Sequence, residues 1–240
     1  MDIRPYGDHA ILINFENKID LEINKKVIVL GNLLSTCEIN GIRHCIPAYC
    51  SLTVIYDPLI TTYHLLKEEI EAVGGLSTEN TKKKGRTLNI PVCYEESLGP
   101  DLRSFADSKS FSVDEVISKH CAQTYHVYML GFLPGFAYMG KLDKSLKAKR
   151  HLSPRLKVPA GSVGLAGSQT AIYPHESPGG WQLIGRTPIK VFDEKRKNPF
   201  LFQVGDKVKF IPIDQDEFKA IEVDIILDKY DVKTLMDVEN

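Results

Sequence analysis

The chain has 240 residues, of which 43% are hydrophobic and 25% charged, and its 30 basic and 31 acidic side chains leave a formal net charge of −1. This balance excludes a polybasic nucleic-acid coat and a polyanionic tail protein, and the composition is typical of a globular protein. A chain of this length can build one large core or two smaller ones.

No segment is apolar enough to predict a membrane span or an export signal. The longest mainly apolar stretch, residues 46–56, is 11 residues long and includes Ser51 and Thr53, whereas a spanning helix needs about 20 apolar residues. No apolar run follows Arg4 near the N-terminus, so we expect no secretory signal and a cytoplasmic location. The five cysteines form no C-x-x-C pair and are expected to be reduced thiols.

Residues 1–75 are expected to form a small α+β domain. A β-rich run at 10–15 is followed by Asp20, whose side chain is a suitable N-cap for a helix. Two further β-rich runs, 42–48 and 51–56, precede a second helix with an apolar stripe at Tyr63, Leu66, Ile70 and Val73. The predicted order is ββαββα, with the helices on one face of the sheet.

The segment 76–86 contains three adjacent lysines and almost no apolar side chain, which predicts a solvated linker. A second domain is expected from 87 to 240. It includes a short helix that starts at the capping-box pair Ser112 and Glu115 and ends near His120.

The second domain is predicted to be mostly β. Its short β-rich runs are separated by Gly or Pro, as in a sandwich or a small barrel, and they span 88–94, 127–132, 161–166, 169–173, 182–184, 190–192, 200–204 and 208–213. Residues 214–240 carry nine acidic and three basic side chains and are expected to form a C-terminal extension with a helix or a peripheral strand.

The segment 159–185 is the strongest candidate for a binding site. It contains six of the 17 glycines, the only Trp and a single charged side chain, Glu176. Glycines allow close approach to a ligand, and neutral donors can fix a small polar molecule. The candidate substrate-binding residues are Gly161, Ser162, Gly164, Gln169 and Thr170, flanked by Arg155 and Arg186, which can bind a carboxylate or a phosphate. The alternative is that the glycines only shape tight turns.

Two residues are candidates for proton transfer. His120 closes the predicted short helix, and Glu176 is an isolated carboxylate in a neutral segment, where burial would raise its pKa. The histidines show no zinc-binding spacing, so no metal site is expected. Residues 135–141 fit the start of a phosphate-binding loop, but Leu142 stands where its Ser or Thr would be.

Several blocks of the sequence resemble the allophanate hydrolase subunit 1 family, also called the Kip-type kinase-inhibitor family. The two blocks 169–174 and 177–188 are long and specific. The resemblance covers nearly the whole chain, at 6–8, 49–58, 90–94, 128–140, 154–155, 158–164, 169–174 and 177–188. It implies a cyclophilin-like β-barrel for the second domain.

The resemblance also implies a component of a 5-oxoprolinase, which uses ATP to open the lactam of 5-oxoproline to glutamate. The A and C subunits of that assembly would be its partners, and the chain would be inactive alone. A lactam is resonance-stabilised, so its opening requires activation such as phosphorylation of the amide oxygen. In this interpretation Arg155 or Arg186 holds a carboxylate or phosphate, the backbone of 161–164 orients the lactam, and His120 or Glu176 moves a proton.

Two other functions stay open within this resemblance. One is an inhibitor that binds a sensor histidine kinase, which requires an exposed protein-binding face and no catalysis. The other is a carboxyltransferase-type component of a urea carboxylase or allophanate system. The sequence does not tell which member of the assembly binds ATP.

Overall fold

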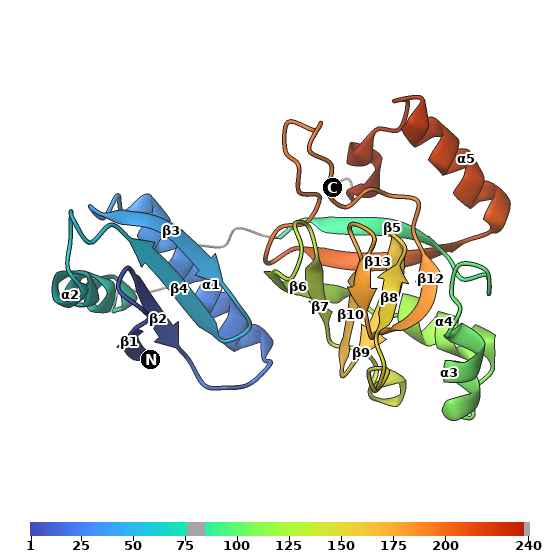
Figure 1. The fold of residues 1–240 in the computed structure, drawn as a ribbon, viewed down its shortest axis with the longest axis horizontal. Helices are drawn as coiled ribbons and strands as arrows, with labels where there is room; N and C mark the ends of the chain where they lie inside the picture. The colour runs from blue at the N-terminus through green and yellow to red at the C-terminus, as the bar shows by residue number, and fades with distance from the viewer. Residues whose placement is uncertain (76–84, 238–240) are drawn as a thin grey trace. The chain divides into compact units, whose positions relative to one another are not determined.

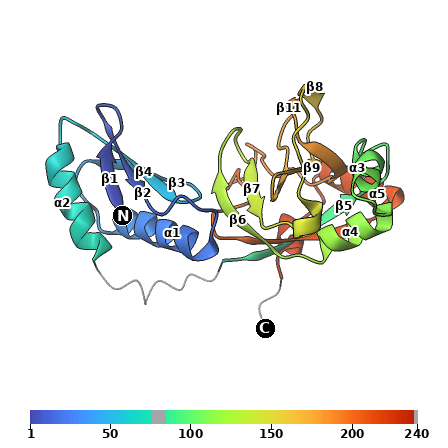
Figure 2. The same cartoon turned by 90° about the horizontal axis from the view of Figure 1, so that it is seen from below.

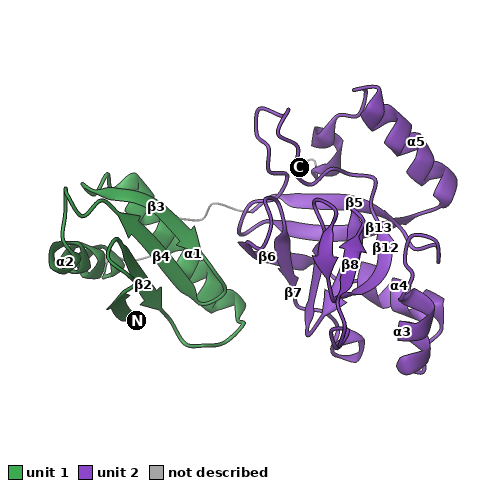
Figure 3. Ribbon diagram, viewed as in Figure 1, with its two compact units in different colours: residues 1–84 green, residues 85–240 purple. Residues whose placement is uncertain are grey.

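The computed structural model describes residues 1–75 and 85–237. The chain divides into two compact units, an N-terminal unit (Met1–Lys84) and a barrel unit (Gly85–Asn240), which are coloured separately in Figure 3. No helix in the described part of the chain is long and apolar enough to cross a bilayer.

The N-terminal unit is a four-stranded antiparallel sheet with two helices. Its elements, in chain order, are β1 (Asp2–Pro5), β2 (Ala10–Asn14), α1 (Leu21–Thr36), β3 (Ile42–Pro47), β4 (Ser51–Tyr56) and α2 (Tyr63–Gly74). The strand order in the sheet is β1-β2-β4-β3. Both helices bury apolar side chains against the sheet, so the unit has a single core that includes Ile11, Leu30, Leu52, Leu66 and Ile70.

The start of α1 confirms the predicted cap. The Asp20 carboxylate accepts hydrogen bonds from the backbone N–H groups of Glu22 and Ile23, which have no partner within the helix itself. One helical turn further, Asn24 is fully buried and its side-chain amide donates to the Ala48 carbonyl oxygen at 2.9 Å. This bond fixes α1 to the connection between β3 and β4.

The barrel unit contains a closed seven-stranded barrel, which confirms the mainly β prediction for this part of the chain. The barrel strands are β5 (Thr87–Cys93), β6 (Tyr125–Leu130), β7 (Ala137–Gly140), β9 (Ser162–Ala166), β10 (Gln169–Ile172), β12 (Gln182–Arg186) and β13 (Lys207–Ile213). Their order around the barrel is β10-β7-β6-β13-β5-β12-β9. Figures 1 and 2 show the barrel in two views. A separate two-stranded sheet pairs β8 (Arg155–Val158) with β11 (Ser177–Gly179).

Three helices pack against the barrel. They are α3 (Leu102–Ser108), α4 (Val113–Cys121) and α5 (Gln215–Ile226), with short 3-10 turns η2 (Lys144–Leu146) and η3 (Val232–Leu235). α3 and α4 lie side by side (Figures 1 and 2). The predicted capping box of α4 is present, since the side chains of Ser112 and Glu115 each accept a hydrogen bond from the other residue's backbone N–H.

Three sequence predictions differ from the structure. The β-rich runs at 190–192 and 200–204 form no strand and meet only in an isolated bridge between Phe192 and Phe200. Arg86, expected in the linker 76–86, instead pairs with the buried Asp206, with Nη2 2.5 Å from Oδ2. This ion pair attaches Arg86 to the barrel unit, so Arg86 is part of that unit and not of a solvated linker. The rest of that predicted linker, 76–84, lies outside the described residues.

Candidate functional site

An aromatic groove of about 270 Å³ opens on the barrel unit. Its lining residues come from the segment after β6, from β7, from the chain before β8 and from the region around β11: Phe132, Phe136, Tyr138, Arg150, His151, Pro154, Tyr173, Pro178, Gly179, Gly180 and Trp181. The rings of Phe136 and Trp181 meet edge to face, with centroids 5.7 Å apart. Such a concave, largely apolar surface with a few polar groups is typical of a small-molecule site.

Glycines allow the backbone to approach these rings. A Cβ on Gly179 would lie 2.4 Å from the Tyr173 hydroxyl oxygen, and one on Gly164 would lie 3.0 Å from the Trp181 Cβ. Larger residues at these two positions would therefore displace the rings. This is the physical reason for part of the glycine enrichment in 159–185.

The rim of the groove is basic. The Arg150 guanidinium lies 5.8 Å from the centre of the Trp181 ring, a cation–π distance. The next residue, His151, is held in place by a hydrogen bond from its backbone N–H to the Gly180 carbonyl oxygen at 2.7 Å. The groove therefore combines aromatic rings packed edge to face with a guanidinium and an imidazole at one edge.

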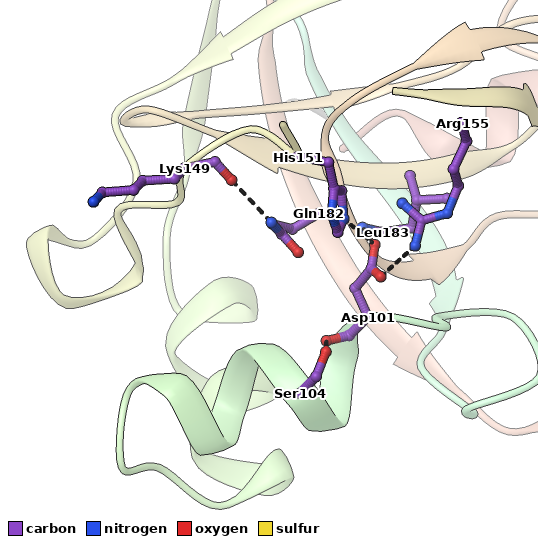
Figure 4. Close-up of polar contacts among 7 residues, drawn as sticks. All are labelled: Asp101, Ser104, Lys149, His151, Arg155, Gln182 and Leu183. Carbon is purple, nitrogen blue, oxygen red and sulfur yellow. Dashed lines mark hydrogen bonds and ion pairs between the residues drawn. The ribbon is translucent and has the colours of Figure 1, made fainter. Parts of the chain in front are cut away.

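Behind this edge, the buried carboxylate of Asp101 joins three elements (Figure 4). It accepts hydrogen bonds from His151 Nε2 at 3.2 Å, from the Leu183 backbone N–H at 2.7 Å and from Arg155 Nη2. Asp101 directly precedes α3, while Arg155 begins β8 and Leu183 lies in β12. The carboxylate thus fixes the position of the His151 ring relative to the barrel.

Arg155, predicted to bind substrate, therefore has an internal partner. Its Nη2 is paired with Asp101, and its Nη1 is buried with no hydrogen-bond partner among the described residues. A buried donor without a partner is unusual and favours an additional ligand at that atom. Its role toward substrate stays a prediction.

His120 is fully buried on the inner side of α4. Its Nδ1 lies 2.8 Å from the Tyr94 hydroxyl and its Nε2 lies 3.1 Å from the Thr170 hydroxyl, and its ring stacks on Phe210. Burial lowers the pKa of His120 to about 3. A neutral imidazole satisfies both contacts, since one ring nitrogen accepts a hydrogen bond while the other donates.

Glu176 occupies a very different environment. Its side chain is 59% exposed, and its carboxylate lies 3.4 Å from the Lys157 Nζ in a surface ion pair. Arg186 is partly buried, and its Nε donates to the Ala160 carbonyl oxygen at 2.7 Å. The neighbouring Gly161 has a φ of +81°, and a Cβ there would lie 2.3 Å from the Thr187 carbonyl oxygen, so this turn requires glycine.

The structure brings several of the predicted site residues together. His120 contacts Thr170, and Arg186 lies beside Gly161 and pairs with Ser162 across β12 and β9. Glu176 forms its ion pair with Lys157. Ser162 is buried in β9, and Gln169 starts β10. The groove residues Tyr138, Arg150, His151 and Tyr173, and the Asp101 behind them, were not among the predicted site residues.

A second, larger concavity of about 700 Å³ lies on the barrel unit near α3. It is lined by Ser104, Phe105, Ser108, Lys109, Lys147, Ala148, Lys149 and Gln182. The Lys149 carbonyl oxygen accepts a hydrogen bond from the Gln182 side chain at 2.9 Å (Figure 4). In the described ranges, no group of three or more His, Cys, Asp or Glu side chains could hold a metal ion.

The chain is similar to known proteins both in sequence and in structure. The chain is 40% identical to the B subunit of the 5-oxoprolinase of Bacillus subtilis, over 91% of this chain and 95% of that protein. It is 48% identical to the corresponding 5-oxoprolinase B subunit of Haemophilus influenzae, over 88% of this chain and 97% of that protein. A crystal structure of TTHA0988 has a TM-score of 0.78 and 34% identity, and the match covers 89% of this chain but 41% of that one.

Longer proteins contain a similar segment. The chain is 25% identical to the urea amidolyase of Lachancea kluyveri over 96% of its own length but only 14% of that protein. Residues 1–202 match the family described as "Carboxyltransferase domain, subdomain C and D". The chain therefore belongs to the carboxyltransferase subdomain C and D family, together with the 5-oxoprolinase B subunits that it matches over nearly their full length.

Proposed function

We propose that the chain is the B-type component of an ATP-dependent 5-oxoprolinase, which opens the lactam of 5-oxoproline to glutamate together with the A and C subunits. The observation that carries the proposal is the identity of 40–48% to two 5-oxoprolinase B subunits over nearly the whole of each chain. The chain acts in a cytoplasmic assembly and is inactive alone. ATP is a substrate of the assembly.

The aromatic groove supports this function as the place where the substrate binds. 5-Oxoproline has a small flat ring with one carboxylate, and the groove offers the faces and edges of Tyr138, Tyr173 and Trp181 beside the cationic Arg150. The unpartnered Nη1 of Arg155 is a further donor near the groove. We retain Arg155 as a carboxylate-binding candidate, with Arg186 as a candidate for a phosphate.

The other predicted residues fit supporting roles in this proposal. Gly161, Ser162 and Gly164 shape the wall behind the groove. His120 and Thr170 hold each other inside the barrel, and Gln169 lies next to Thr170. Glu176 lies on the surface with Lys157, where its carboxylate is available to solvent or to a partner protein.

The first experiment is to measure glutamate release from 5-oxoproline and ATP by the purified A and C subunits, with and without this chain. The proposal predicts release only when all three chains and ATP are present. Release without this chain, or none with it, would contradict the proposal.

The urea carboxylase function has weaker support. The similarity to urea amidolyase is 25% in identity and covers 14% of that protein. The same assay mixture with urea or allophanate in place of 5-oxoproline distinguishes the two functions, and capture of a sensor histidine kinase in place of the A and C subunits would favour the inhibitor function.

A further inference from the structure

His151 combines three features that no other described histidine shares. It lines the aromatic groove, it is about one-third exposed, and its Nε2 lies 3.2 Å from a buried carboxylate oxygen of Asp101. His120 is enclosed in the barrel and neutral, while the ion pair of His9 is with an exposed carboxylate. Among the described histidines, His151 alone has both access to the groove and a fixed partner.

The Asp101 carboxylate is well suited to orient the imidazole. It is held by the Leu183 backbone N–H and by Arg155, so its position does not depend on His151. When Nε2 donates to this carboxylate, the imidazole is in the tautomer whose Nδ1 carries a free lone pair. That Nδ1 makes no hydrogen bond to any residue in 1–75 or 85–237.

The charged and titratable groups around the ring are few. Asp101 and Arg155 form the ion pair behind it, and Arg150 precedes it at the rim. The groove wall contributes two phenols, Tyr138 and Tyr173, whose pKa values are raised by burial, so both stay protonated. Among these groups, the His151 imidazole is the one whose chemistry suits it to accept and return a proton during catalysis.

We propose that His151 is the proton-transfer residue of this groove and that Asp101 is its positioning residue. The inference rests on the proposed function and assigns to His151 the proton transfer that opens the lactam ring. ATP first phosphorylates the lactam oxygen and leaves as ADP. A water oxygen then bonds to the lactam carbon while one water proton passes to His151 Nδ1. The ring C–N bond breaks as His151 returns that proton to the nitrogen, and the new hydroxyl loses its own proton to solvent to form the carbonyl of an acyl phosphate. A second water then cleaves this acyl phosphate to glutamate and phosphate.

The decisive variant is His151→Gln, in which the amide nitrogen can still donate to Asp101 but no basic nitrogen remains. We expect its kcat in the complete assembly to fall by at least about 100-fold, the usual scale of general acid–base catalysis, with little change in KM. The matched control is His175→Gln, since His175 is exposed and lies outside the groove lining. A His151→Gln variant within about threefold of the wild-type kcat would overturn the inference.

Separate effects on kcat and KM distinguish a positioning role from a structural one. Asp101→Asn is expected to lower kcat with little change in KM, because the imidazole stays in the groove but loses the carboxylate that orients it. A wild-type kcat in Asp101→Asn would contradict the positioning role.

A second measurement does not need the assembly. In the isolated chain labelled with ¹⁵N-histidine, the His151 resonance, assigned by its loss in His151→Gln, is expected to show the Nε2–H tautomer. The Nδ1–H tautomer would overturn the proposed Asp101–His151 arrangement. Absence of glutamate release from the wild-type assembly would contradict the proposed function, and the tautomer would still decide the arrangement itself.

Discussion

Asp101 and Leu183, 82 residues apart in sequence, form two hydrogen bonds in which each residue donates once and accepts once. The Asp101 backbone N–H donates to the Leu183 carbonyl oxygen at 2.9 Å, and the Leu183 N–H donates to the Asp101 carboxylate at 2.7 Å. The two bonds attach the start of α3 to barrel strand β12. The same carboxylate then holds His151 and Arg155, so the packing of α3 and the geometry of the groove edge depend on one side chain.

Asp101→Asn should destabilise the barrel unit. The variant keeps the shape of the side chain but leaves the partly buried Arg155 guanidinium without its counter-charge, and breaking such a pair from one side costs about 3 kcal/mol. Chemical denaturation followed by the fluorescence of Trp181, the only tryptophan, reports on this unit. Glu96→Gln, which removes the exposed pair with Arg103, should leave the midpoint unchanged. Equal midpoints for both variants would show that the Asp101 pair is not stabilising.

Stability of the barrel unit should fall with acidification because of His120. Its folded-state pKa is about 3, below the usual value of 6.5, so between these pH values the unfolded chain binds more protons than the folded chain. The contribution of His120 is unchanged above pH 6.5 and is lost progressively as the pH falls toward 3, at up to about 1.4 kcal/mol per pH unit.

The test compares the dependence of unfolding free energy on pH in the wild type and in His120→Gln. We expect the number of protons taken up on unfolding between pH 6 and pH 4 to be smaller by about one in the variant, and the slope to be smaller accordingly. An identical slope in the wild type and in His120→Gln would mean that His120 is protonated in the folded protein.

Thr170→Val should lower the free energy of unfolding by about 1–2 kcal/mol. The isosteric valine removes the hydroxyl that lies 3.1 Å from His120 Nε2, so this buried ring nitrogen loses its partner. Thr170→Ser keeps the hydroxyl and serves as the matched variant. The midpoint of thermal unfolding distinguishes them, and a valine variant as stable as the serine variant would show that the hydroxyl bond contributes little.

Gly179→Ala should disturb the aromatic groove. The added Cβ would lie 2.4 Å from the Tyr173 hydroxyl oxygen and 2.8 Å from two ring carbons, so the Tyr173 ring must move. We expect a loss of about 1–3 kcal/mol in stability. Lactam opening by the assembly should be lost in parallel.

The neighbouring Gly180→Ala is the control for that variant. Its Cβ would make only ordinary contacts, the nearest at 3.5 Å to the His151 carbonyl oxygen. Differential scanning calorimetry should therefore place Gly180→Ala near the wild type and Gly179→Ala well below it. Similar unfolding temperatures for the two variants would contradict the steric argument.

Local chemistry made parts of the fold predictable. The caps at Asp20 and Ser112 depend on side chains within three residues of the backbone groups they bind, and both predicted helix starts are present. The runs at 190–192 and 200–204 had the same β-rich composition as real strands but found no sheet partner beyond one bridge. Strand pairing depends on distant residues, so composition alone could not exclude these two segments.

The candidate site was harder to predict for the same reason. The low charge and high glycine content of 159–185 predicted a packed region, and Gly164 and Gly179 do lie against aromatic rings. His120 was noticed for its place at a helix end, yet its burial comes from Phe210 and Tyr94, which are far away in sequence. His151 stands in a lysine-rich stretch with no local signal, and only the folded chain places it beside Asp101.

The parallel pairing of β5 with β13 has a consequence for how the barrel unit forms. These strands align Thr87 with Lys207 and continue in register to Cys93 and Ile213, so the barrel closes through contacts about 120 residues apart. Contacts of such long sequence separation require costly loop closure and slow the folding of β-rich domains. During synthesis on the ribosome, the strand 87–93 must wait for residues 207–213 to emerge before it can pair with them. The barrel unit should therefore complete its folding only after residue 213 has emerged, well after the N-terminal unit, whose strands all lie within residues 2–56.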